Sequence, residues 1–222
     1  MAMQASSTEP LAEARLEVYA PERSLLVASL LSMSGGFLDA FTWLSLGVFA
    51  SSQTGNVVFL GLYALSGEWQ RALHHLLPLA AFVLGAAVAI RTRAALRCLV
   101  GEIVCLTAAM LLLHRVPDQI VILGISFGIA LQSASFRQVG RWKYLSVTVT
   151  GNMLRAIDQF VAASDRDAAS GAGAMLTLCL MFLLGAAAGG CVTEWLGTWS
   201  LALPIASSAC VLWICRKRSH SH

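Results

Sequence analysis

Long apolar runs constrain this chain more than any other feature of its sequence. A helix needs about 20 predominantly apolar residues to cross a hydrocarbon layer of about 30 Å. Six runs reach or approach this length, and the third is the shortest. We expect six transmembrane helices, near residues 24–48, 72–90, 97–114, 118–136, 172–193 and 199–215.

The composition supports a membrane protein. Hydrophobic residues make up 57% of the 222 residues and charged residues only 12%. Soluble domains average about 45–50% apolar and 25% charged residues. The chain therefore lacks the polar surface of a soluble enzyme, a disordered chain or a nucleic-acid-binding protein. The lipid bilayer is its expected partner, and nucleic acid is not.

Two shorter elements, 49–66 and 144–163, differ from the six runs. Each begins with an extended-looking stretch and continues through Thr-Gly-Asn into a short apolar helix. The β-branched run 147–150 favours a strand, and Thr-Gly-Asn supplies capping side chains for a helix start. We expect two broken or re-entrant helices here.

The two halves of the chain resemble each other. Matching segments occur in the same order at offsets of 94, 96 and 100 residues, and they pair 36–40 with 130–134, 54–56 with 150–152, and 82–89 with 182–189. Small-residue runs recur in many membrane proteins, but three ordered matches predict an internal repeat. We divide the chain into a cytosolic tail (1–23), a first repeat (24–115), a second repeat (116–217) and a short tail (218–222), forming one membrane domain.

The positions of Lys and Arg predict the orientation of these repeats. If each Thr-Gly-Asn element enters the membrane and returns to the same side, each half makes three crossings and the halves are inverted. Twelve Lys and Arg residues then lie inside and two outside; if both elements cross fully, the split is eight to six. The positive-inside rule favours inverted repeats with both termini cytoplasmic.

Asp39 is one candidate functional residue, because an ionisable group deep in an apolar run is costly and marks a functional site by default. A structural role is equally consistent: a buried Asp that caps a neighbouring helix start. Because Gly35 and Gly36 precede Asp39, they would let another backbone approach or let the helix bend.

The two Thr-Gly-Asn segments are the second candidate. Helix N-termini carry unpaired N–H groups and partial positive charge, and irregular backbone at membrane depth must be buried in protein or line a cavity. Transporters built from inverted repeats bind substrates at such junctions, and converging N-termini favour an anion or a group with acceptor oxygens. Alternatively, Thr and Asn only cap the broken helices.

The remaining candidates are polar residues near these elements. Arg155 either binds substrate, pairs locally with Asp158, which we favour, or pairs with Asp39 across the repeat. We expect Glu102 to pair with Arg93 or Arg97 at the interface, and the histidines to be surface or interfacial. The predicted substrate-binding residues are Asp39, Thr54, Gly55, Asn56, Gln132, Ser133, Thr150, Gly151, Asn152 and Arg155.

Catalytic motifs are missing from the sequence. We find no G-x-S-x-G, no H-E-x-x-H and no Gly-rich phosphate loop with a Lys. The six cysteines lie in or beside apolar runs without metal-ligand spacing, so we expect neither a metal nor a cofactor. The chain is therefore not expected to be an enzyme.

Two segments resemble a known family. GGFLDAFTWLSLGVFASSQTGNVVFLGL (35–62) and ALQSASFRQVGRWKYLSVTVTGNMLRA (130–156) are similar to the YoaK-like bacterial membrane proteins, domain-of-unknown-function family 1275. The resemblance covers about residues 25–215 and implies a multi-pass inner-membrane protein without an established activity. The second motif usually reads Gly-Leu-Gln-Asn-Ala in that family, and here Ser133 replaces the Asn.

These features lead to a first hypothesis and two alternatives. The first is a small secondary transporter or channel-like permease for a small polar, preferably anionic, solute bound between the two Thr-Gly-Asn helix starts. The alternatives are a non-transporting scaffold or regulatory protein, and a membrane enzyme that acts on lipid with Asp39 and Ser133. The small-residue faces 85–89 and 185–190 also permit close packing within one chain or in a homo-oligomer.

Overall fold

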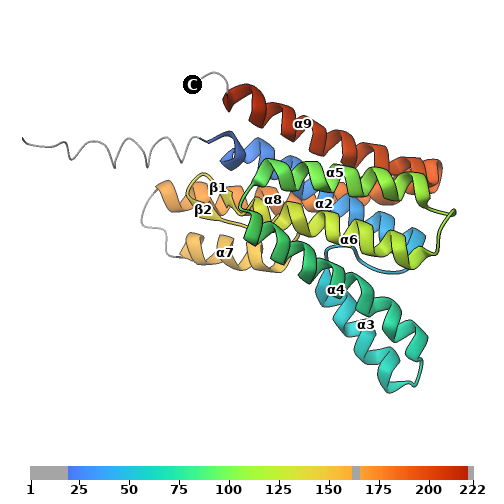
Figure 1. The fold of residues 1–222 in the computed structure, drawn as a ribbon. Helices are drawn as coiled ribbons and strands as arrows, with labels where there is room; N and C mark the ends of the chain where they lie inside the picture. The colour runs from blue at the N-terminus through green and yellow to red at the C-terminus, as the bar shows by residue number, and fades with distance from the viewer. Residues whose placement is uncertain (1–19, 162–165, 220–222) are drawn as a thin grey trace, which may run out of the picture.

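The computed structural model describes residues 20–161 and 166–219 as a helical bundle with one short β-hairpin (Figure 1). Its α-helices are α2 (Leu25–Leu46), α3 (Gln53–Leu65), α4 (Trp69–Thr92), α5 (Ala95–Leu112), α6 (Asp118–Ser135), α7 (Val149–Val161), α8 (Arg166–Leu196) and α9 (Ala202–Ser219). The shorter elements are the 3-10 helices η1 (Pro21–Arg23) and η2 (Gly197–Leu201) and the strands β1 (Gln138–Val139) and β2 (Trp142–Lys143).

The long helices suit a lipid environment. Within the described residues, five stretches have the length and apolar character to cross a membrane: Leu25–Leu46, Trp69–Thr92, Ala95–Leu112, Asp118–Ser135 and Ala168–Lys217, the last of which includes α8 and α9. Large apolar side chains stay exposed on the helices, including Val83 at 68% and Leu183 at 63%. Such faces suit lipid as their solvent. The expected all-α architecture is confirmed, and its long helices have the length and apolar character of membrane spans.

The helices pack in pairs that correspond between the two halves. Helix α2 packs along α8, and α6 packs along α4; α3 packs on α4, and α7 packs on α8. Helix α9 contacts α2, α5 contacts α6, and α5 and α9 contact each other. If α2, α3, α4 and α5 are matched in order with α6, α7, α8 and α9, each pair in one half has its counterpart in the other.

Glycines bring the two main helix pairs into close contact at corresponding positions. A Cβ atom at Gly185 would overlap the carbonyl oxygen of Met33, and a Cβ atom at Gly85 would lie 2.6 Å from the carbonyl oxygen of Phe127. Gly85 and Gly185 occupy the same place in the 82–89 and 182–189 segments, and Met33 and Phe127 are separated by the 94-residue offset. Small residues permit such approach in membrane helices.

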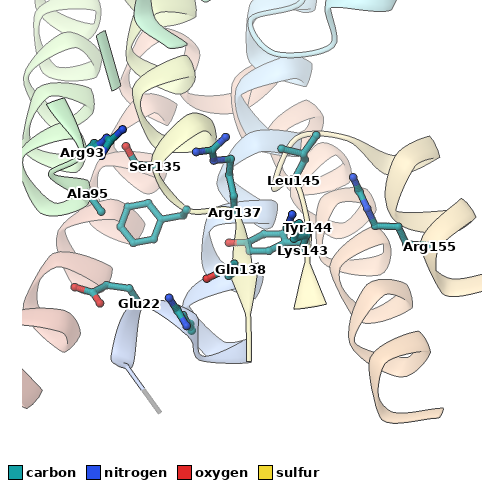
Figure 2. A pocket seen from close by; sticks show the side chains of 12 residues that line it. Glu22, Arg93, Ala95, Ser135, Arg137, Gln138, Lys143, Tyr144, Leu145 and Arg155 are labelled. Atoms are coloured by element: carbon teal, nitrogen blue, oxygen red, sulfur yellow. The ribbon is translucent and has the colours of Figure 1, made fainter. Parts of the chain in front are cut away.

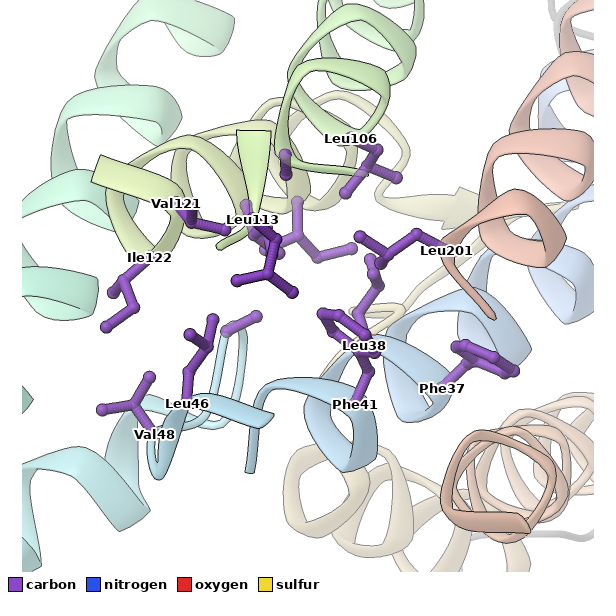
Figure 3. Close-up of a cluster of buried hydrophobic side chains, with 14 of the residues drawn as sticks. Phe37, Leu38, Phe41, Leu46, Val48, Leu106, Leu113, Val121, Ile122 and Leu201 are labelled. Carbon is purple, nitrogen blue, oxygen red and sulfur yellow. The ribbon is translucent and has the colours of Figure 1, made fainter. Parts of the chain in front are cut away.

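The largest buried cluster anchors the chain just before α3. It joins Phe41 of α2 to Leu106 of α5, Ile122 of α6 and Leu201 of η2 (Figure 3). The same cluster includes Leu46, Val48 and Ala50, which end α2 and begin the following loop. Core packing thus holds this non-helical segment in place.

Both extended stretches are loops, and the strand expected at 147–150 is wrong. Residues 47–52 and 144–148 are neither helix nor strand, and α7 already begins at Val149. The described β-hairpin lies earlier, where Gln138 pairs with Lys143 and Val139 with Trp142. The β-branched run has no strand beside it, so side chains rather than a ladder satisfy the loop backbone.

The helix ends gather at two opposite ends of the bundle (Figure 1). The start of α2 and the ends of α4, α6 and α9 lie at the left of the view, whereas the α5–α6 and α8–α9 junctions lie at the right. Helices α3 and α7 begin near the middle and run toward opposite ends.

Candidate functional site

A cavity of about 470 Å³ lies between the starts of α3 and α7, and we call it the inner pocket. One wall comes from residues 51–54 and another from residues 145 and 147–150. The other lining residues come from α4, from the end of α6 and from the residues just after it: Phe82, Ala86, Ser133, Ala134 and Arg137. The structure thus places a cavity where the two Thr-Gly-Asn segments meet.

Asp39 does not line this pocket, but it binds two residues that do. Its side chain is only 4% exposed. Oδ1 accepts hydrogen bonds from the backbone N–H groups of Ser51 at 2.7 Å and Ser52 at 3.3 Å. Oδ2 accepts from the Ser51 hydroxyl at 2.9 Å and from the Ser52 hydroxyl. The capping role considered for Asp39 is therefore present, and it fixes two serines that line the pocket.

Asn56 and Asn152 make the same pair of hydrogen bonds in the two halves. Asn56 Oδ1 accepts from Phe49 N at 3.1 Å and its Nδ2 donates to Phe49 O at 2.7 Å. Asn152 Oδ1 accepts from Leu145 N at 3.2 Å and its Nδ2 donates to Leu145 O at 2.8 Å. Each Asn binds the backbone seven residues earlier, and both are buried. The two amides hold the loops and do not line the pocket.

Helix side chains bind the same loops from the other side. Thr42 Oγ1 accepts from Ala50 N at 3.0 Å. Gln132 Nε2 lies 3.3 Å from both Leu31 O and Ser146 Oγ, to which it donates. Irregular backbone inside a bilayer needs such internal partners, so these residues explain how non-helical loops persist within the bundle.

Three of the ten predicted site residues line the inner pocket directly: Thr54, Thr150 and Ser133. Ser133 also donates to Ile129 O at 2.8 Å. Gly55 and Gly151 provide room, because an added Cβ would lie 2.8 Å from the Phe49 ring or 3.1 Å from Thr148 Cγ2, respectively. The remaining predicted residues hold the loops or, in the case of Arg155, line a second cavity.

Arg155 does not pair as expected. Its Nη1 donates to Asn152 Oδ1 at 3.4 Å, and within the described residues it forms no ion pair with Asp158, which is exposed. The local pairing is therefore wrong, and Asp39 instead binds Ser51 and Ser52. Helical side chains point toward the helix N-terminus, which carries Arg155 back toward Asn152 and away from Asp158.

Glu102 is also placed differently from the sequence prediction. It is fully buried, and its Oε2 accepts from the Ser208 hydroxyl of α9 at 3.1 Å. Arg93 and Arg97 are exposed, so the predicted interfacial pairing is wrong. Glu102 faces α9 because that helix packs against α5.

Two histidines of α4 contact other parts of the bundle, whereas His114 is exposed as expected and His220 and His222 lie outside the described residues. His75 is buried, with its Nδ1 3.3 Å from Asn56 Oδ1. His74 Nε2 lies 2.7 Å from the carbonyl oxygen of Leu46. The expectation of peripheral histidines is wrong for His75, because α3 covers that face of α4.

A second cavity of about 770 Å³ adjoins the inner pocket, and we call it the vestibule. Arg137 and Leu145 line both cavities. Basic side chains dominate the lining of the vestibule (Figure 2), which consists of Glu22, Arg23, Arg93, Ala95, Ser135, Phe136, Arg137, Gln138, Lys143, Tyr144, Leu145 and Arg155.

Several lining residues were not predicted from the sequence. Ser51 and Ser52 are separated from the first Thr-Gly-Asn segment by one residue, Gln53, and occupy the positions equivalent to Val147 and Thr148. Their position beside this motif was the sequence signal that could have identified them as lining residues. Arg137 was interpreted as a charged loop residue. Its position at the pocket depends on where α6 ends, at Ser135, and the sequence does not fix that end.

The inner pocket offers hydroxyl groups and two helix starts. Such groups donate hydrogen bonds to a solute with acceptor oxygens. In the described part of the chain, no three His, Cys, Asp or Glu residues cluster as metal ligands. Ser133 and Asp39 bind the backbone of Ile129 and the two serines, respectively, and not each other. This geometry gives the lipid-enzyme alternative no nucleophile–base pair.

Comparison with known proteins gives a family. A family model described as a protein of unknown function, DUF1275, matches residues 27–214. Searches of curated proteins and of solved structures found no match. The family match includes every helix that walls the inner pocket and both Thr-Gly-Asn segments. The chain therefore belongs to the DUF1275 family of proteins of unknown function.

Proposed function

We propose that this chain is a small secondary transporter or channel-like permease whose solute binds in the inner pocket. The observation that carries the proposal is the cavity walled by the starts of α3 and α7. Partial positive charge at helix N-termini and unpaired N–H groups favour a small polar, preferably anionic, solute. Transporters with broken helices bind substrates at comparable junctions.

We also propose that the two halves are inverted repeats in the inner membrane, with both termini cytoplasmic. The exchangeable helix pairs, the two glycine contacts and the Asn56 and Asn152 bonds support a repeat. The opposite directions of α3 and α7 support its inversion (Figure 1). The uneven division of Lys and Arg supports the orientation.

Within this proposal, the ten site residues have two kinds of role. Thr54, Ser133 and Thr150 contact the solute through their hydroxyl groups. The other residues act indirectly, by holding or making room for the loops or by drawing an anion toward the pocket: Asp39, Gly55, Asn56, Gln132, Gly151, Asn152 and Arg155.

Solute flux into reconstituted vesicles tests the function. The purified chain should conduct at least one of a panel of small solutes: chloride, nitrate, acetate, phosphate and urea. Replacing Thr54 and Thr150 together with Val keeps the side-chain shape and removes two hydroxyls. We expect flux to fall about fivefold or more, because the lost hydrogen bonds contribute roughly 1 kcal/mol to solute binding and this free energy corresponds to about a fivefold change.

Thr107→Val is the matched control, because Thr107 Oγ1 bonds to Ile103 O on α5, outside the pocket lining. Its flux should equal that of the unchanged chain. A folded chain that moves no solute would contradict transport. So would a double variant that conducts as well as the control.

One observation favours the alternative of a scaffold or regulatory protein. The polar groups of Asp39, Asn56 and Asn152 form hydrogen bonds with the two loops and do not line the cavity. If the folded chain conducts nothing in the flux assay, this non-transporting role is the better account.

A further inference from the structure

The vestibule concentrates positive charge that the inner pocket does not explain. Five cationic side chains and one carboxylate, that of Glu22, line it (Figure 2). Arg93 directly follows α4, Arg137 follows α6 and Lys143 lies in β2, so three separate parts of the chain bring these charges to one cavity. Among the described residues, these three side chains form no ion pair. Their charge is thus directed to the cavity or to solvent.

A buried hydroxyl also points into this cavity. Tyr144 is only 1% exposed, and its hydroxyl has no hydrogen-bond partner among the described residues. Figure 2 shows the hydroxyl directed between Arg137 and Gln138. Ser135 Oγ, in the same lining, likewise has no partner within the described chain. Buried hydroxyls without partners cost free energy and call for an explanation.

Burial keeps the Tyr144 hydroxyl in its donor form. The charged phenolate would be desolvated at this buried position. The group is therefore a protonated, neutral donor throughout the physiological pH range. Such a donor complements the nearby cations rather than competing with them.

Membrane topology explains only part of this arrangement. The positive-inside rule places Lys and Arg at this end of the bundle, and Arg93 and Arg137 also suit the negative ends of α4 and α6. Neither effect requires buried, unpartnered hydroxyls that face the same cavity as the cations. A ligand with several acceptor oxygens accounts for both the charges and the hydroxyls.

We propose that the vestibule binds an oxyanion of the phosphate class, either free in solution or as the head group of an anionic lipid. Arginine side chains bind such groups bidentately, and Tyr144 and Ser135 supply neutral donors. A cavity of about 770 Å³ is large enough for a group of this size. The proposal does not rest on transport, because binding here is measured without flux.

Titration of the purified chain with two probes tests the proposal. The first probe is inorganic phosphate added to the protein in a neutral detergent, with heat of binding as the readout. The second is phosphatidylglycerol in nanodiscs, compared with pure phosphatidylcholine, with melting temperature as the readout. We expect at least one of the two probes to bind.

Tyr144→Phe is the sharpest variant, because it removes one hydroxyl and keeps the buried ring. Affinity for the probe should fall about fivefold, the equivalent of one hydrogen bond. The melting temperature without ligand should stay the same or rise, because an unpartnered polar group is lost. If the hydroxyl had only a structural role, Tyr144→Phe would lower the melting temperature without ligand and leave the affinity for the probe unchanged.

A charge variant and a matched control complete the test. Arg137→Gln with Lys143→Gln should reduce affinity tenfold or more, since charged hydrogen bonds are stronger. Arg91→Gln with Arg97→Gln removes two exposed charges from the α4–α5 corner, outside the vestibule lining, and should leave affinity unchanged.

The outcomes separate the two sources of the ligand. Phosphate binding that both variants weaken identifies a free anion, and stabilisation by phosphatidylglycerol alone identifies a lipid head group; each supports the proposal. The proposal is overturned if neither probe binds the unchanged chain, or if the vestibule variants lose no more affinity than the control.

Discussion

At the scale of single residues, polar groups in this protein mainly hold irregular backbone inside the bundle. A buried carboxylate is costly in an apolar helix, but Asp39 accepts four hydrogen bonds from two consecutive serines. Asn56 and Asn152 bind the backbone of Phe49 and Leu145 in the same way. The pocket-lining groups are thus positioned by residues that do not themselves line the pocket.

Asp39→Asn should destabilise the protein. An amide can accept at only one of its two polar atoms, and its NH₂ group would face N–H and O–H donors. We expect a loss of about 2–3 kcal/mol in unfolding free energy, since hydrogen bonds to a charged group are lost. Thermal or denaturant unfolding in detergent measures this change.

Asp158→Asn is the control for this substitution, because Asp158 is an exposed carboxylate on α7. Its stability should match that of the unchanged chain. Equal stability of the Asp39 and Asp158 variants would show that the four hydrogen bonds contribute little.

The sequence permitted some residue roles to be predicted and not others. The depth of Asp39 in its apolar run left two interpretations with equal weight, a functional group and a cap for a neighbouring helix start, and the second corresponds to the hydrogen bonds that it accepts. The contacts of Glu102 and His75 could not be predicted, because their partners, Ser208 and Asn56, lie on other helices. The contact of Arg155 with Asn152 depends on the direction of its side chain, which the sequence does not show. Sequence spacing does not show which face of α5 or α4 another helix covers.

At the scale of elements, the two short helices begin alike and are packed differently. Phe59 of α3 stacks on Trp43 and His75, with ring centroids 5.4 and 5.1 Å apart. The residue equivalent to Phe59 in the second half is Arg155, which lines the vestibule. The first element is therefore held by an aromatic stack, and the second presents a cation to a cavity.

The element boundaries follow the sequence closely, apart from the expected strand. Apolar run length sets where helices can form, so the six predicted runs correspond to α2, α4, α5, α6, α8 and α9. The strand at 147–150 failed because propensity is local, whereas a strand needs a neighbour with which to pair. The hairpin at 138–143 had no hydrophobic pattern strong enough to predict it.

Close helix packing at Gly185 provides a test at this scale. Gly185→Ala should lower the melting temperature, because the new Cβ would overlap the Met33 carbonyl and push α2 from α8. Gly190→Ala is the matched control on the same helix, since its Cβ would meet nothing within 4 Å. That control should be neutral or slightly stabilising. Equal melting temperatures for the two variants would contradict the contact.

At the scale of the whole molecule, the account depends on two halves that bring two helix starts to one cavity. The sequence offsets predicted a repeat, and the helix pairs and glycine contacts follow the same correspondence. The sequence predicted a site between the two Thr-Gly-Asn helix starts, but not the remaining walls of the inner pocket, because these come from α4, from α6 and from Arg137, which follows α6. The inverted orientation is the part of the proposal that gives the two halves opposite directions across the membrane.

Cysteine accessibility measures that orientation directly. Single cysteines at three exposed positions, Ser45, Ser66 and Thr92, are placed in a chain whose own six cysteines are replaced by Ala. Intact cells are then treated with a membrane-impermeant maleimide. If α3 returns to the side it came from, cysteines at 45 and 66 react in intact cells, and the cysteine at 92 reacts only after permeabilisation. Reaction at 45 and 92 with protection at 66 would mean that the first Thr-Gly-Asn element crosses the membrane, which would contradict the inverted arrangement.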